Sequence, residues 1–308
     1  MMQLKDMGER RAIDGIWKIL KKKQAYDDCV YIKMGNLYQL YTVDFIGEGV
    51  HFMREWNPEK VGAFFASINL SDIAAMGGLP DLFMASMSFP QDLDWDYVES
   101  FVLGMNSVLQ GFGVPYYGGD FKESKSVGMS GFAVGHVEAN RILRRNTVSK
   151  GERVFVTGEL GKQAAGYFLW KNGHDEGIEY LLDVHPRIEE GRRISELGSA
   201  CMDLSDGLLA SVKFMGNEKY GLEIYFDKIP IHKLAYEVSE DYGLPLEYLA
   251  TMFGGEYELV YTAKRGVVGT EIGEVVEREN AGIWKENKKF EGEGYAHFSQ
   301  TLGKIGRQ

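Results

Sequence analysis

The most constraining feature of this sequence is a nearly apolar helical segment that carries a carboxylate. Between residues 58 and 76 the apolar side chains recur at helical spacing, and Gly77 and Gly78 end the pattern. Asp72 lies three residues after Asn69, so the two polar side chains share one strip beside the apolar face. A carboxylate among apolar residues must be paired, protonated or bound to a cation. The segment therefore predicts a buried helix whose carboxylate needs a partner.

The rest of the sequence predicts two domains of mixed α and β structure. A chain of 308 residues suits two domains, and the charged segment 141–152 is the best linker between residues 1–140 and 153–308. In the first domain we expect helices near 8–23, 58–76 and 94–110 and strands near 29–33, 37–43, 82–89 and 127–138. In the second we expect helices near 161–171, 187–198, 206–216 and 231–242, and strands near 153–157, 200–204, 222–227, 257–263 and 271–277. This order indicates an α+β first domain and an α/β or α+β second domain.

The overall composition narrows the class of protein. The 45 acidic residues outnumber the 34 Lys and Arg, giving a net charge of −11, so nucleic acid is not expected as the main partner. Two cysteines are too few for a disulfide framework, and no apolar run approaches the ~20 residues of a membrane span. We therefore expect a cytoplasmic protein that neither crosses nor binds a membrane.

Acidic residues with glycine or other small neighbours occur at five places, namely Asp27–Asp28, Asp44, Asp72, Gly118–Asp120 and Asp203–Gly207. Each place except Asp72 is also explained by helix capping or a turn, because Asp is common in both. The six histidines are scattered and neither cysteine has a close partner, which argues against a soft metal site. Oxygen ligands favour Mg²⁺, which a few carboxylates share with substrate phosphates. The pattern therefore favours metal-assisted phosphoryl transfer, in which cations hold a polyanionic nucleotide on an acidic protein.

The known nucleotide-binding signatures are absent from the sequence. No segment has the spacing of a Walker loop, a dinucleotide-binding loop or the protein-kinase motifs. In the segment GELG, Gly158 and Gly161 are equally consistent with backbone N–H groups that bind a phosphate and with a tight turn. A standard P-loop enzyme is therefore excluded.

Several motifs together resemble one family. They are DD at 27–28, VDFIGEGVHF at 43–52, SINLSDIAAMGGLP at 67–80, GGD at 118–120, TGELG at 157–161, MDLSDGL at 202–208, FGGEYELV at 253–260 and GYAHF at 294–298. In this order they resemble the thiamine-monophosphate kinases, a branch of the ATP-binding superfamily that includes aminoimidazole ribonucleotide synthetase. The motifs SDIAAMGG and DLSDGL are typical of the superfamily, whereas EGVHF and the closing GYAHF point to the thiamine branch.

The resemblance implies a fold, a reaction and a set of site residues. It implies a ferredoxin-like, PurM-N type N-terminal domain whose sheet pairs across a homodimer, and a PurM-C type C-terminal α/β domain. ATP would lie between the domains and phosphorylate thiamine monophosphate to thiamine diphosphate, with several Mg²⁺ ions. The implied metal ligands are Asp28, Thr42, Asp44, Asp72, Asp120, Asp203 and Asp206. The implied nucleotide contacts are Gly119, Asp120, Arg145 and Ser205, and the implied thiamine contacts are His51, Glu256 and either Tyr295 or Phe298.

The reaction that the resemblance implies needs no general base. A phosphate monoester has a second pKa near 6 and is mostly dianionic at neutral pH. The sequence correspondingly offers no obvious His or Lys base beside the acidic motifs, so we expect in-line transfer by positioning and charge neutralisation.

The sequence also departs from the family pattern. Tyr26 stands where the family has a glycine before the paired aspartates, and the motif around Glu256 is one acidic residue shorter. Val43, beside Asp44, offers only its backbone to a cation. Arg145 is equally consistent with a solvated linker, and Tyr295 and Phe298 with core aromatics.

Two other functions remain open from the sequence. Aminoimidazole ribonucleotide synthetase shares the GGD and DGL elements, although the EGVHF motif and the aromatic tail disfavour it. A dimer that binds a nucleotide without catalysis is the alternative from another class, because a domain can keep ATP while losing an acceptor pocket.

Overall fold

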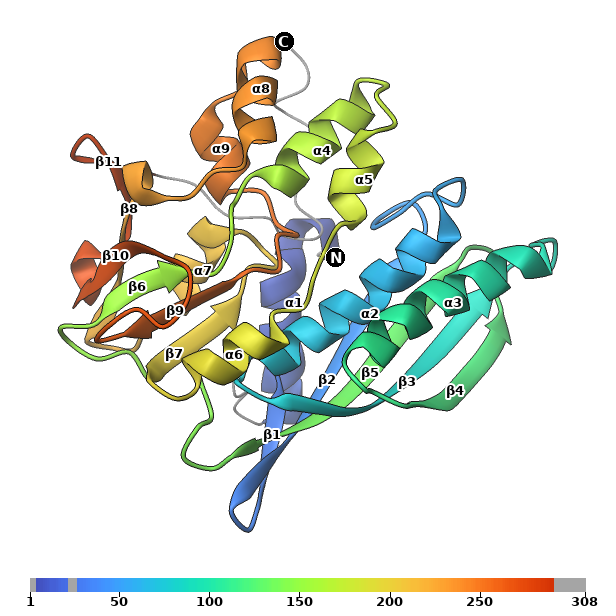
Figure 1. Ribbon diagram of the computed structural model, residues 1–308, viewed down its shortest axis with the longest axis horizontal. Helices are drawn as coiled ribbons and strands as arrows, with labels where there is room; N and C mark the ends of the chain where they lie inside the picture. The colour runs from blue at the N-terminus through green and yellow to red at the C-terminus, as the bar shows by residue number, and fades with distance from the viewer. Residues whose placement is uncertain (1–3, 22–26, 291–308) are drawn as a thin grey trace.

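A computed structural model describes residues 4–21 and 27–290 of the chain. The described residues form two domains, each built around one β-sheet (Figure 1). None of the helices within these described ranges is long and apolar enough to cross a membrane.

The N-terminal sheet has five strands in the order β1-β2-β5-β3-β4. They are β1 (Val30–Met34), β2 (Leu37–Gly47), β3 (Leu79–Phe89), β4 (Tyr116–Glu123) and β5 (Gly128–Glu138). The β3–β4 pair is parallel and the other pairs are antiparallel. Helices α2 (Pro58–Ala75) and α3 (Trp95–Gly111) cover one face of this sheet, and α1 (Leu4–Leu20) precedes it (Figure 1).

Helix α2 is the central element of the molecule, and local sequence fixes both its start and its close packing. The side chain of Asn57 accepts hydrogen bonds from the N–H groups of Glu59 and Lys60, and Pro58 occupies the first turn. A Cβ on Gly62 would lie 1.9 Å from the carbonyl oxygen of Phe101, so only glycine allows α3 to pack this closely. Helix α2 is consequently buried on nearly all sides, as the apolar sequence pattern predicts.

The C-terminal sheet has seven strands in the order β12-β11-β8-β10-β6-β9-β7. They are β6 (Arg153–Val156), β7 (Gly198–Asp203), β8 (Tyr220–Tyr225), β9 (Leu259–Ala263), β10 (Thr270–Glu277), β11 (Gly282–Lys285) and β12 (Lys288–Lys289). The helices are α4 (Lys162–Lys171), α5 (Gly177–Leu182), α6 (Ile188–Ile194), α7 (Leu208–Phe214), α8 (Lys233–Tyr242) and α9 (Leu246–Thr251). Only the β8–β11 pair is parallel among the strand pairs of the described residues.

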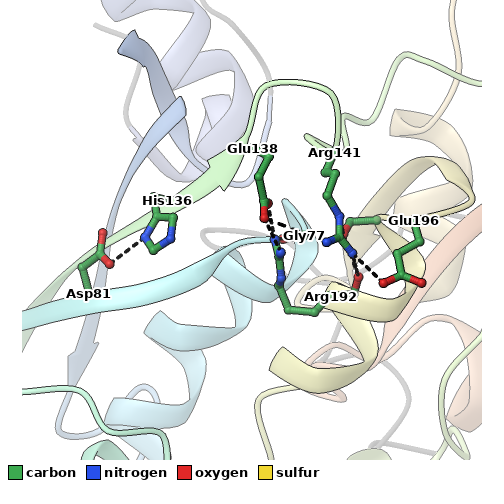
Figure 2. A network of polar contacts seen from close by, with 8 residues as sticks. Gly77, Asp81, His136, Glu138, Arg141, Arg192 and Glu196 are labelled. Atoms are coloured by element: carbon green, nitrogen blue, oxygen red, sulfur yellow. Dashed lines mark hydrogen bonds and ion pairs between the residues drawn. The ribbon is translucent and has the colours of Figure 1, made fainter. Parts of the chain in front are cut away.

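Polar contacts join helix α6 to the N-terminal domain (Figure 2). Arg192 donates two hydrogen bonds to the carboxylate of Glu138, at 2.8 and 2.9 Å, and one to the carbonyl oxygen of Gly77 at 2.7 Å. Arg141, which follows β5, donates to Glu196 at 2.9 Å. The Arg192 guanidinium holds the pKa of Glu138 at about 2. These contacts fix α6 against the end of α2, so α2 is held between the two domains.

Most of the expected elements are present, and the differences have local causes. The expected helix at 187–198 ends at Ile194, because strand β7 already begins at Gly198. The sequence patterns did not predict β4, because the glycines and charged residues of this exposed edge strand read as a turn. They also missed α5, α9, β11 and β12, which have at most six residues each and therefore carry little periodicity.

Candidate active site

Three carboxylates from distant parts of the sequence meet at the junction of the domains. Asp28 precedes β1, Asp72 lies in the last turn of α2, and Asp203 ends β7. One oxygen from each carboxylate lies within 4.8 Å of the others. The nearly apolar helix thus brings its carboxylate to two further acidic groups, and we call Asp28, Asp72 and Asp203 the aspartate triad.

The electrostatics of the aspartate triad show an excess of negative charge. Burial, then the charges of Asp44 and Asp203, raise the pKa of Asp72 well above its usual range. Burial and the charge of Asp28 raise the pKa of Asp203 to about 8. The hydroxyl of Thr42 donates to Asp72, and Ser71 donates to Asp203 at 2.7 Å. These two hydrogen bonds orient the carboxylates but leave most of the repulsion uncompensated.

Arg145 brings a positive charge to the aspartate triad. Its guanidinium donates two hydrogen bonds to Asp28, at 2.6 and 3.2 Å, and its backbone N–H donates to Asp27 at 2.8 Å. Burial acts to lower the pKa of Arg145, but the Asp28 carboxylate outweighs it and the pKa is raised. The structure therefore gives Arg145 a partner within the protein, in place of the solvated linker position that the sequence left open.

A cavity of about 410 Å³ adjoins the aspartate triad. Its polar lining includes Asp44, His51, Ser205 and Asp206, all of which the sequence predicted as site residues. The N–H of Asp44 donates to Asn69 Oδ1 at 3.2 Å, and Asn69 lies one helical turn before Asp72 in α2. The cavity therefore lies next to the aspartate triad. No Lys or Arg is among the lining residues within the described part of the chain.

The tautomer of His51 follows from its hydrogen bond to the backbone. The N–H of Gly47 donates to His51 Nδ1 at 3.1 Å, so Nδ1 carries no proton and the neutral ring carries its proton on Nε2. Glu48 anchors the same loop by accepting from Arg54 at 3.0 and 3.1 Å and from the N–H of Val127 at 2.8 Å. His51 therefore reaches the cavity on a preformed loop.

Glu256 is buried and does not line the cavity. Its carboxylate accepts from the N–H of Gly161 at 2.6 Å, and burial raises its pKa to about 8. Gly161 has a φ of 92° and a Cβ on Gly158 would lie 2.2 Å from an oxygen of Glu258. The structure thus favours the tight turn at 158–161 over phosphate binding by the Gly161 N–H.

Gly119 and Asp120 lie apart from the cavity and the aspartate triad. Gly119 packs against β3, where a Cβ would lie 1.7 Å from the carbonyl oxygen of Ala85. Asp120 is exposed on the edge strand β4, and Lys122 pairs with it at 2.8 Å. Tyr295 and Phe298 lie outside the described residues, so their expected thiamine contacts stay predictions.

The sequence patterns missed the aromatic wall of the cavity, which includes Trp56, Phe64, Tyr167, Trp170, Phe253 and Tyr257. The rings of Trp56 and Trp170 meet edge to face with their centroids 5.2 Å apart. Gln163, Tyr167 and Trp170 recur at spacings of four and three residues in α4. That spacing puts them on one face of a helix, and was the signal that could have identified them.

The side chains of the aspartate triad are suitable ligands for magnesium. They are carboxylate oxygens, which suit this hard cation, and their crowding raises the pKa values of Asp72 and Asp203. A divalent cation would offset the repulsion that burial of three carboxylates creates.

One family model matches the N-terminal domain. The family described as AIR synthase related protein, N-terminal domain, matches residues 26–137. Together with the two sheets and the acidic cluster, this match defines a protein of the PurM-like class, which confirms the expected fold class.

Two relatives and one solved structure cover most of the chain. Thiamine-monophosphate kinase from Aquifex aeolicus is 36% identical over 96% of this chain and 100% of its own length. Thiamine-monophosphate kinase from Archaeoglobus fulgidus is 34% identical over 88% of this chain and 90% of its own. The solved structure of AaThiL complexed with AMPPCP and TMP superposes with a TM-score of 0.87 at 33% identity, covering 96% of this chain and 99% of that one. The chain belongs to the thiamine-monophosphate kinase family of enzymes.

Proposed function

We propose that this enzyme transfers the γ-phosphoryl group of ATP to the phosphate of thiamine monophosphate (TMP), giving thiamine diphosphate and ADP. The observation that carries the proposal is the aspartate triad beside a cavity whose polar lining includes Asp44 and Asp206. The relatives bear the name of this activity, and the related structure holds an ATP analogue together with TMP.

The chemistry of the acceptor fits the groups that the site offers. A phosphate monoester is mostly dianionic at neutral pH, so its oxygen attacks without a base that removes a proton. Neutral His51 has its proton on Nε2 and suits donation to an acceptor oxygen, but it does not suit proton removal at that atom. The residues therefore act by binding the two substrates in line and by excluding water.

Asp28, Asp72 and Asp203 would hold magnesium, with Asp44 and Asp206 available from the cavity wall. Bound Mg²⁺ would supply the positive charge that lets two phosphate groups approach each other. Thr42 and Ser71 keep Asp72 and Asp203 oriented through their hydroxyl groups. Ser205 lies at the cavity wall and is the proposed nucleotide contact there.

A homodimer is part of the proposal. The face of the N-terminal sheet away from α2 carries apolar side chains that are each more than half exposed, namely Val30, Ile32, Met34, Val43 and Phe45. Register places Asp120 opposite Ser86 and Ser86 opposite Ser130, next to Phe45. An exposed apolar face of this kind favours pairing with a second copy. The proposed metal role of Asp120 and nucleotide role of Gly119 therefore depend on that second copy.

An assay of ADP formation tests the proposed reaction. ADP release by the purified protein with ATP and Mg²⁺ should rise strongly when TMP is added, with thiamine diphosphate as the second product. Stimulation by formylglycinamidine ribonucleotide in place of TMP would instead establish the aminoimidazole ribonucleotide synthetase activity. Nucleotide binding without stimulation by either compound would indicate a non-catalytic protein.

Sedimentation tests the homodimer. Val43→Glu, which puts a charge on the apolar face, should convert a dimer into a monomer. Leu103→Glu is the matched control, because Leu103 is equally exposed but lies on α3 at the other side of the sheet, and this variant should stay dimeric. A monomeric wild-type protein would contradict the proposal.

A further inference from the structure

Two buried polar atoms at the cavity have no hydrogen-bond partner among the residues that the structure describes. They are Trp56 Nε1 and Gln163 Oε1, and their side chains belong to residues only 5% and 2% exposed. Both residues line the cavity next to the aspartate triad. Buried polar atoms in native proteins nearly always have a partner, so two exceptions at one cavity point to a ligand that supplies them.

The two atoms differ in what they require. An indole N–H can only donate a hydrogen bond, and the carbonyl oxygen of a glutamine side chain can only accept one. Gln163 Nε2 already donates to the carbonyl oxygen of Asp183, although at 3.4 Å. The missing ligand must therefore offer one acceptor to Trp56 and one donor to Gln163.

The surroundings specify the shape of that ligand. Gln163 lies on the same face of α4 as Tyr167 and Trp170, and Trp56 comes from the other domain to meet Trp170 edge to face. Tyr167 also contacts Phe253, with ring centroids 5.3 Å apart. Walls of this kind favour a flat aromatic ring. An aromatic ring that contains acceptor nitrogens and carries an amino group can pack against these side chains. It can also give Trp56 Nε1 an acceptor and Gln163 Oε1 a donor.

We propose that Trp56 and Gln163 recognise the aminopyrimidine ring of the phosphate acceptor. Trp56 Nε1–H donates to a ring nitrogen, and the exocyclic amino group donates to Gln163 Oε1. This inference rests on the proposed function, because it assigns the ring to TMP. Adenine offers the same two kinds of group, so charge decides between the two substrates.

The charge of the cavity favours TMP over the nucleotide base at this wall. Within the described residues the lining has Asp44 and Asp206 but no Lys or Arg. The thiazolium ring of TMP is a cation, and it suits both carboxylates and aromatic faces. The base and ribose of ATP carry no positive charge, so this part of the nucleotide gains nothing from such a lining.

Entry of the ring requires a local rearrangement. The pocket walls cover both polar atoms in this structure, so side chains must shift before a ligand reaches them. The amide of Gln163 makes one long hydrogen bond, to the carbonyl oxygen of Asp183, and this bond must break if the amide turns. The Trp56–Trp170 contact must loosen as well, so TMP should change the intrinsic tryptophan fluorescence.

Two variants and an altered substrate test the proposal. Trp56→Phe removes the donor and keeps an aromatic ring, and Gln163→Met removes the acceptor at nearly equal volume. Oxythiamine monophosphate carries a carbonyl group where TMP has its amino group. Each substitution should raise KM for TMP about tenfold, the usual cost of one lost hydrogen bond at a buried site. Gln163→Met should also lower the preference for TMP over oxythiamine monophosphate about tenfold, while KM for ATP stays unchanged.

Tyr97→Phe provides a matched control. Tyr97 Oη is also a buried polar atom without a partner in the described part of the chain, but Tyr97 does not line the cavity. Its removal should leave KM for TMP and the substrate preference unchanged. Circular dichroism of all three variants tests whether the fold is intact. If either Trp56→Phe or Gln163→Met fails to fold, the KM of the other variant tests the proposal.

The possible outcomes separate this inference from the proposed function. If the wild-type protein forms no ADP in response to TMP, the proposed function is wrong. If the wild type phosphorylates TMP and both variants keep the wild-type KM and preference, the function stands and the inference is wrong. A rise in KM for ATP, with a weaker preference for ATP over ITP, would put the nucleotide base at this wall and would also overturn the inference.

Discussion

Asp72→Asn tests the idea that repulsion within the aspartate triad destabilises the metal-free protein, and that the same carboxylates bind the metal. At 4.8 Å, the separation within which the aspartate triad lies, two unit negative charges repel by about 3.5 kcal/mol at an effective dielectric constant near 20. Asparagine removes one charge from the triad and keeps an oxygen that can accept the hydrogen bond from Thr42. Protonation already relieves part of the repulsion in the wild type, so we expect a gain of about 2 kcal/mol in the free energy of unfolding without metal.

Thermal unfolding in EDTA at pH 8 measures this gain. A gain of that size corresponds to a rise in Tm of roughly 4–8 °C. Turnover with Mg²⁺ should meanwhile fall by at least about a hundredfold, because the variant loses a metal ligand. Mg²⁺ should also raise the Tm of the wild type more than that of the variant. Asp92→Asn is the matched control, since Asp92 is an exposed carboxylate outside the cluster and its loss should change neither quantity.

The pH dependence provides a second readout of the same cluster. The pKa of Asp203 is raised from 3.8 to about 8, so the native state holds a proton that the unfolded chain releases. The corresponding stability is fully present below about pH 4 and is lost as the pH rises through 8. The wild type in EDTA should therefore become less stable between pH 5 and pH 8, and Asp72→Asn should reduce that slope. A less stable Asp72→Asn variant in EDTA, or an active one in Mg²⁺, would contradict the proposed metal role of the aspartate triad.

Three further predictions concern packing, the His51 tautomer and the domain junction. Gly62→Ala should cost about 3 kcal/mol in urea unfolding because of the 1.9 Å approach to Phe101, whereas Gly111→Ala, which meets nothing within 4 Å, should be neutral or stabilising. His51→Gln keeps a donor near the Nε2 position and should raise KM for TMP less than His51→Asn does; equal effects would contradict the donor role. Arg192→Met should lower stability by about 1 kcal/mol at pH 7, and calorimetry should find that this difference shrinks as the pH falls from 4.5 toward 2, where Glu138 protonates.

Local patterns predict those parts of the fold whose signal lies within a few turns of the chain. The apolar periodicity of α2, its two closing glycines and the alternating strands are properties of neighbouring residues, and they predict their elements well. The edge strand β4 was missed because its glycines form a bulge that only its neighbour β3 stabilises. The short helix α9 and the strands β11 and β12 likewise depend on packing and not on their own periodicity.

The sequence likewise identifies some residues of the candidate site but not the contacts between them. The sequence identified the acidic residues, since a carboxylate among apolar neighbours is costly wherever it lies. It did not reveal that Glu256 caps the turn at Gly161, or that Arg145 pairs with Asp28. Each of these contacts joins residues about a hundred positions apart. No local sequence pattern predicts which polar groups at such separations will form hydrogen bonds.

The class of this protein, the family it resembles, the apolar helix and the need of Asp72 for a compensating charge all follow from the amino-acid sequence. The folded structure is needed to know which other carboxylates lie beside Asp72 and which aromatic side chains line the cavity next to them. This is so because burial and charge repulsion depend on distances in space and not on separation along the chain. The neighbours of a carboxylate in the chain indicate the free-energy cost of burying it. Its partners depend on how α2, β7 and the segment before β1 pack together.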